Sequence, residues 1–116
     1  MTDTIKLELP WPPSVNRYYR TVLGRMLISK EGREYRKAIE QLVSVPVMFT
    51  GRVAVTVECH APDRRRRDLD NLGKCLFDSL THAGVWEDDS QIDDMRIVRA
   101  GVMPRGMVRV EIRGIA

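Results

Sequence analysis

Polar and hydrophobic residues alternate in three stretches of the chain, residues 5–9, 53–59 and 107–113, which is the pattern of a strand with one buried face. A short apolar run at 95–98 predicts a fourth strand. The most regular stretch places four side chains on one face, Val53, Val55, Val57 and Cys59. Because glycine and proline residues separate the last two strands, we expect these two strands to form a hairpin.

Two further stretches carry apolar residues at three- and four-residue spacing, the pattern of a helix with one buried face. Ser29 is expected to cap the first helix, which would end near Val43. Asp70 is expected to cap the second, which would run from Asn71 to a stop at Gly84. The inward faces are predicted to carry Tyr35, Ala38, Ile39 and Leu42 in the first helix, and Leu72, Leu76, Leu80 and Ala83 in the second.

The stretch 11–20 is predicted to be irregular, because two prolines fix the backbone and remove donors. Its aromatic and basic side chains could stack on bases and pair with phosphates. The alternative is that Trp11 and one tyrosine pack in the core while the arginines are simply solvated. The candidate DNA-binding residues in and beside this stretch are Asn16, Arg17, Tyr18 and Arg20.

The order of these elements predicts a small α+β domain of mixed α/β character, with a mixed sheet packed by two main helices. A chain of 116 residues allows one domain, residues 1–116, with one modest core. The N-terminal residues are too polar for a signal peptide, so we expect a cytoplasmic protein with no membrane partner. Cys59 and Cys75 are expected to be buried free thiols.

Charge is distributed unevenly along the chain. Residues 68–94 contain eight acidic residues and one basic residue, whereas the remainder contains 18 basic and 8 acidic residues. An acidic island in a basic protein suits an enzyme that holds a metal ion and acts on a polyanion. A solvated charged surface is the alternative.

One motif concentrates both signs of charge. The four arginines Arg64, Arg65, Arg66 and Arg67 lead directly into Asp68 and Asp70, and Lys74 follows one helical turn later. A second group of acids, Glu87, Asp88 and Asp89, follows after a helix-sized interval. Magnesium prefers carboxylate and phosphate oxygens and needs few protein ligands, so these residues predict a Mg²⁺ site for phosphoryl chemistry. The spacing leaves open which acid of residues 87–89 would bind the metal.

Other chemistries do not fit. An EF-hand starting at Asp68 would place Leu72 and Ser79 where oxygen-rich ligands are required. The chain contains neither a glycine-rich phosphate loop nor a dinucleotide-binding glycine pattern. His60 and His82 lack metal-ligand spacing.

Trp-Pro-Pro-Ser at 11–14, the motif at 63–74 and Trp-Glu-Asp-Asp at 86–89 together resemble the RusA family of Holliday-junction resolvases. The resemblance implies a homodimeric endodeoxyribonuclease that uses Mg²⁺, with Mn²⁺ as a substitute, to nick four-way DNA junctions. It implies catalytic and metal-binding roles for Asp68, Asp70 and Asp89, with Asp88 as the alternative ligand, and a catalytic role for Lys74. Arg67 matches a DNA-contacting position. A related structure-directed nuclease and a catalytically silent DNA-binding module are the alternative functions.

Overall fold

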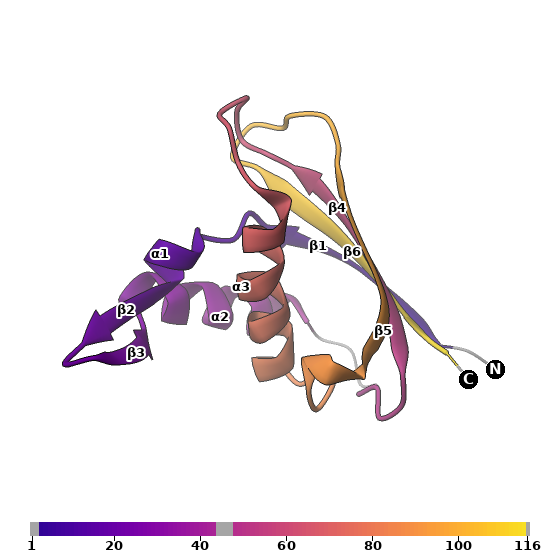
Figure 1. The fold of residues 1–116 in the computed structure, drawn as a ribbon. Helices are drawn as coiled ribbons and strands as arrows, with labels where there is room; N and C mark the ends of the chain where they lie inside the picture. Colours follow the sequence, from indigo (N-terminus) through magenta and orange to yellow (C-terminus); the bar gives the residue numbers. More distant parts are fainter. Residues whose placement is uncertain (1–2, 44–47, 116) are drawn as a thin grey trace.

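The computed structural model describes residues 3–43 and 48–115 (Figure 1). Its elements in chain order are β1 (Thr4–Pro10), α1 (Val15–Tyr18), β2 (Tyr19–Val22), β3 (Arg25–Ile28), α2 (Lys30–Leu42), β4 (Val53–His60), α3 (Leu69–His82), the 3-10 helix η1 (Asp89–Gln91), β5 (Ile92–Arg99) and β6 (Met107–Gly114). The predicted class, a mixed sheet with two main helices, is confirmed. No helix within the described residues is long and apolar enough to cross a membrane.

The main sheet has the strand order β1-β6-β4-β5. Strands β4 and β5 are parallel, and the other two pairs are antiparallel. The predicted hairpin of the last two strands is therefore wrong, because β4 lies between β5 and β6. The reason is burial: β4 is the most apolar strand and takes a central place, and α3 provides the crossover that a parallel β4–β5 pair requires.

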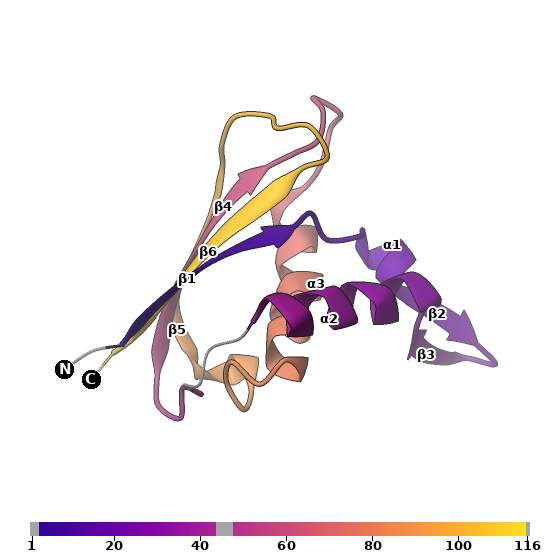
Figure 2. The same ribbon diagram turned by 180° about the vertical axis from the view of Figure 1, so that it is seen from behind.

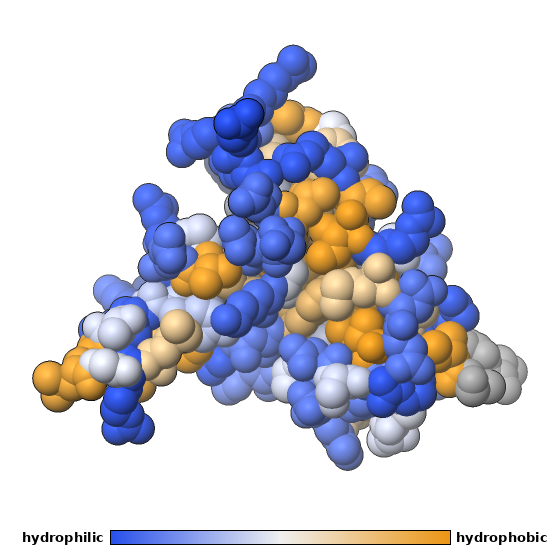
Figure 3. Space-filling model, in the orientation of Figure 1, coloured by the Kyte–Doolittle hydropathy of each residue, from blue (hydrophilic) through white to orange (hydrophobic). Residues whose placement is uncertain are grey.

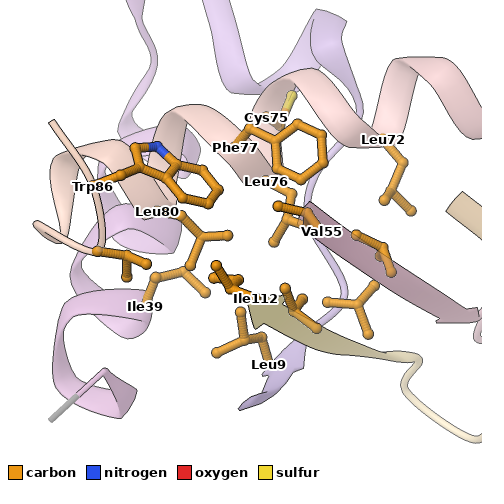
Figure 4. Packing of buried hydrophobic residues seen from close by; sticks show 14 of the residues in the cluster. Leu9, Ile39, Val55, Leu72, Cys75, Leu76, Phe77, Leu80, Trp86 and Ile112 are labelled. Carbon is orange, nitrogen blue, oxygen red and sulfur yellow. The ribbon is translucent and has the colours of Figure 1, made fainter. Parts of the chain in front are cut away.

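Both long helices pack on one face of the sheet (Figure 2). The core between the helices and the sheet contains four fully buried side chains from this side, Ile39 of α2, Leu76 and Leu80 of α3, and Trp86 (Figure 4). The indole nitrogen of Trp86 donates to the hydroxyl of Thr81 at 2.6 Å, so this large side chain is buried without an unpaired donor.

The predicted bounds of α2 are confirmed, whereas two residues of its predicted inward face are not buried. The Ser29 hydroxyl accepts from the backbone N–H of Gly32 at 2.9 Å, and Tyr35 is buried as expected. Ala38 is only half-buried and Leu42 is 49% exposed, because the last turn of α2 extends past the sheet-facing core.

The end of α3 follows the prediction, whereas its start does not. The N–H of Gly84 donates to the Thr81 carbonyl at 3.0 Å and that of Val85 donates to the Leu80 carbonyl at 3.2 Å, the bonds of a glycine-terminated helix. The N-cap is Asp68 rather than Asp70, so the helix begins two residues earlier than expected.

The segment 11–20 is more regular than predicted. Residues 15–18 form one helical turn, α1, and the chain then enters a β2–β3 hairpin that forms a separate two-stranded sheet. The hairpin was missed because its turn, Leu23-Gly24, lacks the Asn-Gly or Asp-Gly pair that marks a two-residue loop in sequence.

Candidate functional site

The four arginines lie in a loop between β4 and α3, here called the arginine loop (residues 63–67). The guanidinium of Arg67 folds back onto the Asp63 carboxylate at 2.8 Å and lies 5.8 Å from the ring centre of Trp11. The backbone N–H of Arg65 also donates to Asp63 at 2.9 Å. These bonds, with Arg67 first, lower the pKa of Asp63. Arg64 and Arg66 remain exposed, so the loop presents positive charge to solvent.

The arginine loop leads directly into the first turn of α3. Asp68 is the N-cap, yet its carboxylate makes no capping bond, and the side chain is exposed. Asp70 lies in the first helical turn and accepts from the N–H of Asn71 at 3.0 Å. An N-cap carboxylate normally bonds the free N–H groups of the first turn. Since Asp68 does not, its oxygens remain available to a ligand.

Lys74 lies one turn further along α3, on the side that faces the hairpin. Its ammonium is 5.3 Å from the ring centre of Tyr19, within the range of a cation–π contact. Tyr19 in turn stands edge-on to Tyr18, with ring centres 4.7 Å apart. Tyr19 is therefore a positioning residue for Lys74, a role that no pattern in the sequence indicated.

The second group of acids lies at the start of η1 and is here called the acidic turn (residues 87–89). The side-chain amide of Gln91 donates to the carbonyls of Phe49 and Gly51 at 2.9 and 2.8 Å. Its oxygen accepts from the backbone N–H groups of Glu87 and Asp88. A single buried glutamine thus fixes the acidic turn against the approach to β4, a role that no pattern in the sequence marked.

The carboxylates of the acidic turn differ in their surroundings. Asp88 accepts from the hydroxyl of Ser90 at 2.7 Å, and bonds from Ser90 lower its pKa. The pKa of Asp89 is raised, first by burial, then by Asp88, and also by the charge of Asp78 on α3. Asp89 therefore lies near other carboxylates, and a bound cation would relieve the repulsion between their negative charges.

The structure does not gather the three predicted carboxylates into one cluster. Asp68 and Asp70 lie together where the arginine loop enters α3, whereas the acidic turn contacts α3 near its other end (Figure 1). Within residues 3–43 and 48–115, no three His, Cys, Asp or Glu side chains are close enough together to hold a metal ion. The predicted metal ligands therefore lie in two separate groups, one at the start of α3 and one in the acidic turn.

Tyr18 does not fit its predicted role in DNA binding, because its side chain is fully buried. Its hydroxyl donates to Asp78 at 2.5 Å and accepts from Arg36 at 2.8 Å. Arg36 also donates to Asp78 at 2.5 Å. Burial and the bond to Asp78 raise the pKa of Tyr18 to about 12. This cluster joins α1, α2 and α3, so Tyr18 positions the surrounding elements instead of facing a ligand.

A groove of about 890 Å³ opens between the Trp11–Ser14 segment, α2, the arginine loop and the start of α3. Asp68 and Asn71 lie on its wall. Its basic lining residues are Arg17, Arg65, Arg66, Arg67, Arg99 and Arg105. Two of these, Arg99 and Arg105, come from the end of β5 and the following loop and were not predicted. Arg99 donates to the Arg67 carbonyl at 3.0 Å, so it also supports the arginine loop.

The remaining predicted contacts lie on the surface around this groove. Arg17 lines the groove, and Asn16 and Arg20 are exposed nearby on α1 and β2. The groove therefore brings basic side chains beside Asp68 at the start of α3.

Both cysteines are buried free thiols, as expected, and burial raises the pKa of Cys75 to about 11.

Comparison with known proteins gives consistent matches over nearly the whole chain. The family model described as Endodeoxyribonuclease RusA matches residues 10–113. A crossover junction endodeoxyribonuclease RusA of Shigella sonnei is 47% identical over 113 residues, covering 95% of this chain and 94% of that protein. Proteins of the same name from Escherichia coli K12 and Enterobacteria phage 82 are 46% and 47% identical with the same coverage.

Asp89→Asn should make the protein more stable to urea at neutral pH in EDTA. Because the pKa of Asp89 is raised above its ordinary 3.8, the folded state binds this proton more tightly than the unfolded chain, and ionisation therefore costs stability. The gain should stay below about 1 kcal/mol, since water screens a largely exposed group. It should shrink as the pH falls through the raised pKa, where the wild-type carboxyl is protonated.

Asp93→Asn is the matched control, because a bond from Arg52 lowers the pKa of Asp93. This variant should lose stability at neutral pH, and the loss should vanish in acid as the wild-type pair breaks. Equal effects of the two substitutions on the urea midpoint would contradict the assigned surroundings of Asp89.

Proposed function

The chain belongs to the RusA family of endodeoxyribonucleases, and from that premise we propose that it resolves four-way (Holliday) DNA junctions by paired symmetric nicks, in DNA recombination and repair. The relatives that match it along 95% of its length carry the name crossover junction endodeoxyribonuclease. Because DNA is the proposed substrate, we place the protein in the bacterial cytoplasm.

One observation carries the proposal: the arginine loop ends at Asp68 and Asp70, and both lie exposed at the start of α3. Exposed arginines bind phosphates and orient the duplex. The free N–H groups of a helix N-terminus also favour an anion. A phosphodiester bound by these groups would lie beside carboxylates that can bind a metal ion. Fold stability alone requires no such juxtaposition.

Mg²⁺ is the proposed cofactor, with Mn²⁺ as a substitute. The donor set fits, since the candidate ligands Asp68, Asp70 and Asp89 all offer carboxylate oxygens, and Mg²⁺ needs only one or two of them beside waters and substrate phosphates. Asp89 is preferred over Asp88, whose carboxylate already accepts from Ser90. When bound, the ion would lower the pKa of the attacking water and neutralise charge on the phosphate.

The side chains of the protein have separate roles in this proposal. Arg64, Arg65 and Arg66 bind phosphates and set the register of the DNA. Arg67, tied to Asp63, acts mainly by shaping the loop. Lys74 places its ammonium near the reacting phosphate, where it stabilises the charge that develops in the transition state. The contact with Tyr19 keeps Lys74 in place before DNA arrives.

We also propose that the active form is a homodimer. Resolution of a junction into two intact duplexes requires two cuts placed symmetrically about the crossover, and each chain has one arginine loop and one acidic turn. A two-fold dimer presents two equivalent sites to the pseudo-symmetric DNA. A catalytically silent junction-binding protein is the alternative, and the lack of a three-carboxylate cluster among the described residues is the observation that favours it.

Asp70→Asn should reduce Mg²⁺-dependent cleavage of a synthetic four-way junction by about 100-fold or more, because it removes a negative charge that holds the ion. Junction affinity in a gel shift should stay equal or rise, since less negative charge faces the phosphates. Asp94→Asn is the control, an exposed acid of the same acidic island on β5. Asp78 is unsuitable because it bonds Arg36 and Tyr18.

The outcomes of this experiment separate the candidate functions. A wild-type protein that shifts the junction but never cuts it is a binding module. Cleavage of forks and bubbles as fast as junctions would indicate a general structure-directed nuclease. An Asp70→Asn variant that cuts at the wild-type rate would exclude this carboxylate from the site.

Arg66→Ala and Lys74→Ala should separate binding from chemistry. Loss of one phosphate contact at Arg66 should weaken binding. It should also make the negative slope of log affinity against log salt concentration shallower by roughly 0.9. Lys74→Ala should leave affinity nearly intact and reduce the single-turnover rate. Equal losses of affinity in both variants would mean that Lys74 is only a further phosphate anchor.

Mixed dimers of one wild-type and one Asp70→Asn subunit should nick a supercoiled cruciform plasmid without linearising it, because only one of the two sites is active. Wild-type dimers should give linear product within one binding event. A chain that sediments as a monomer both free and on the junction, or mixed dimers that make both cuts, would contradict the two-site arrangement.

A further inference from the structure

The β2–β3 hairpin extends away from the sheet and ends in an exposed apolar tip (Figures 1 and 3). Leu23 at the turn is 97% exposed and Met26 is 63% exposed, and Val22 and Leu27 are also exposed. The hydrophobic core includes Tyr18, at the base of this hairpin, but none of the residues at its tip. A tip of this composition indicates a partner.

The turn itself is costly for the residue that occupies it. Leu23 and Gly24 have φ angles of 52° and 76°, so both lie in the left-handed region. Asparagine and glycine suit such a position, whereas leucine does not. Neither backbone conformation nor solvation accounts for a leucine here. A contact of its side chain with a partner would account for it.

The charge around the tip identifies the chemistry of the partner. From Ser14 to Lys30 the chain contains four basic residues and no acidic residue. Two of the four, Arg20 and Arg25, lie on the strands of the hairpin and are exposed. The partner is therefore anionic around an apolar centre, a description that fits stacked bases between two phosphate backbones.

The base of the hairpin is fixed relative to the proposed catalytic residues. Tyr19, the first residue of β2, lies under the ammonium of Lys74. The backbone N–H of Ser29, which follows β3, donates to the Tyr18 carbonyl at 2.9 Å, and the Ser29 hydroxyl donates to the same carbonyl at 3.0 Å. Four residues of strand separate this base from the turn, a reach of roughly 14 Å. The tip is thus held at a set distance from the candidate active site.

We infer that the hairpin senses the branch point of the junction, with Leu23 inserted against bases that are unstacked there and Arg20 and Arg25 on the flanking phosphates. Leucine is among the side chains that wedge between base steps. A branch point lowers the energy needed for insertion, since its base pairs already lack one stacking neighbour. This inference rests on the proposed function and assigns its selectivity for junctions over duplexes to the hairpin.

The test uses a four-way junction with 2-aminopurine beside the branch point, bound by the full-length protein in EDTA. Wild-type protein should raise the fluorescence of this base, because insertion unstacks it. Leu23→Asn, which suits the left-handed backbone and so folds, should lose most of this rise. With Mg²⁺ it should cut the junction about tenfold more slowly, while its affinity for a linear duplex stays unchanged.

Leu42→Asn is the control, since it removes another exposed leucine at the end of α2, away from the hairpin. It should behave as wild type in both assays. Wild-type fluorescence and cleavage in Leu23→Asn would overturn the inference while leaving the proposed function intact. Conversion of a dimer to a monomer by Leu23→Asn would overturn it as well, because the tip would then contact a second copy. If wild-type protein neither binds nor cuts the junction, the proposed function fails first.

Discussion

The packing of α3 on the main sheet is the interaction on which the rest of the structure depends. Leu76 and Leu80 of α3 are fully buried in the core, and burial of such side chains is worth about 1.5–3 kcal/mol each. The same contact provides the crossover that allows β4 and β5 to be parallel. It also fixes which side of α3 faces solvent. Asp70, Lys74 and Asp78 follow one another at four-residue spacing, so the polar side of one helix carries both catalytic candidates and the tie to α2.

A second constraint is the partly buried cluster of Arg36, Asp78 and Tyr18. Each member bonds both of the others, so loss of one removes two of the three hydrogen bonds, at a cost of about 1–3 kcal/mol. The cluster fixes α1 against α3, and α1 carries the hairpin and Tyr19. Through this chain of contacts the position of Lys74 and the reach of the hairpin depend on the same three polar groups. If substitution of Asp78 lowered activity, the cause would therefore be displacement of Lys74 and the hairpin and not loss of a catalytic group.

Much of the fold could be predicted from periodicity, because the two long helices carry buried residues at helical spacing and β6 alternates buried and exposed residues. The strand order could not, since alternation reveals that a strand is half-buried and does not reveal its neighbour. Local sequence patterns gave the wrong answer at two points. Asp70 matched the N-cap pattern, yet α3 starts before it. The sequence could not show which of the adjacent residues Tyr18 and Tyr19 is buried, because this depends on the helical turn α1. Gln91 and Arg99 were missed because their roles depend on contacts with distant backbone carbonyls.

The central claim is that the exposed acids at the start of α3, beside the arginine loop, serve a metal-dependent cleavage site. Crystals grown with a junction and Mn²⁺ would test it directly through the anomalous signal of the metal. The account predicts a peak in direct contact with the carboxylates of Asp68 and Asp70, beside a phosphate bound by the arginine loop. A peak held by Asp78 and Asp88, with Asp68 and Asp70 out of contact, would contradict it.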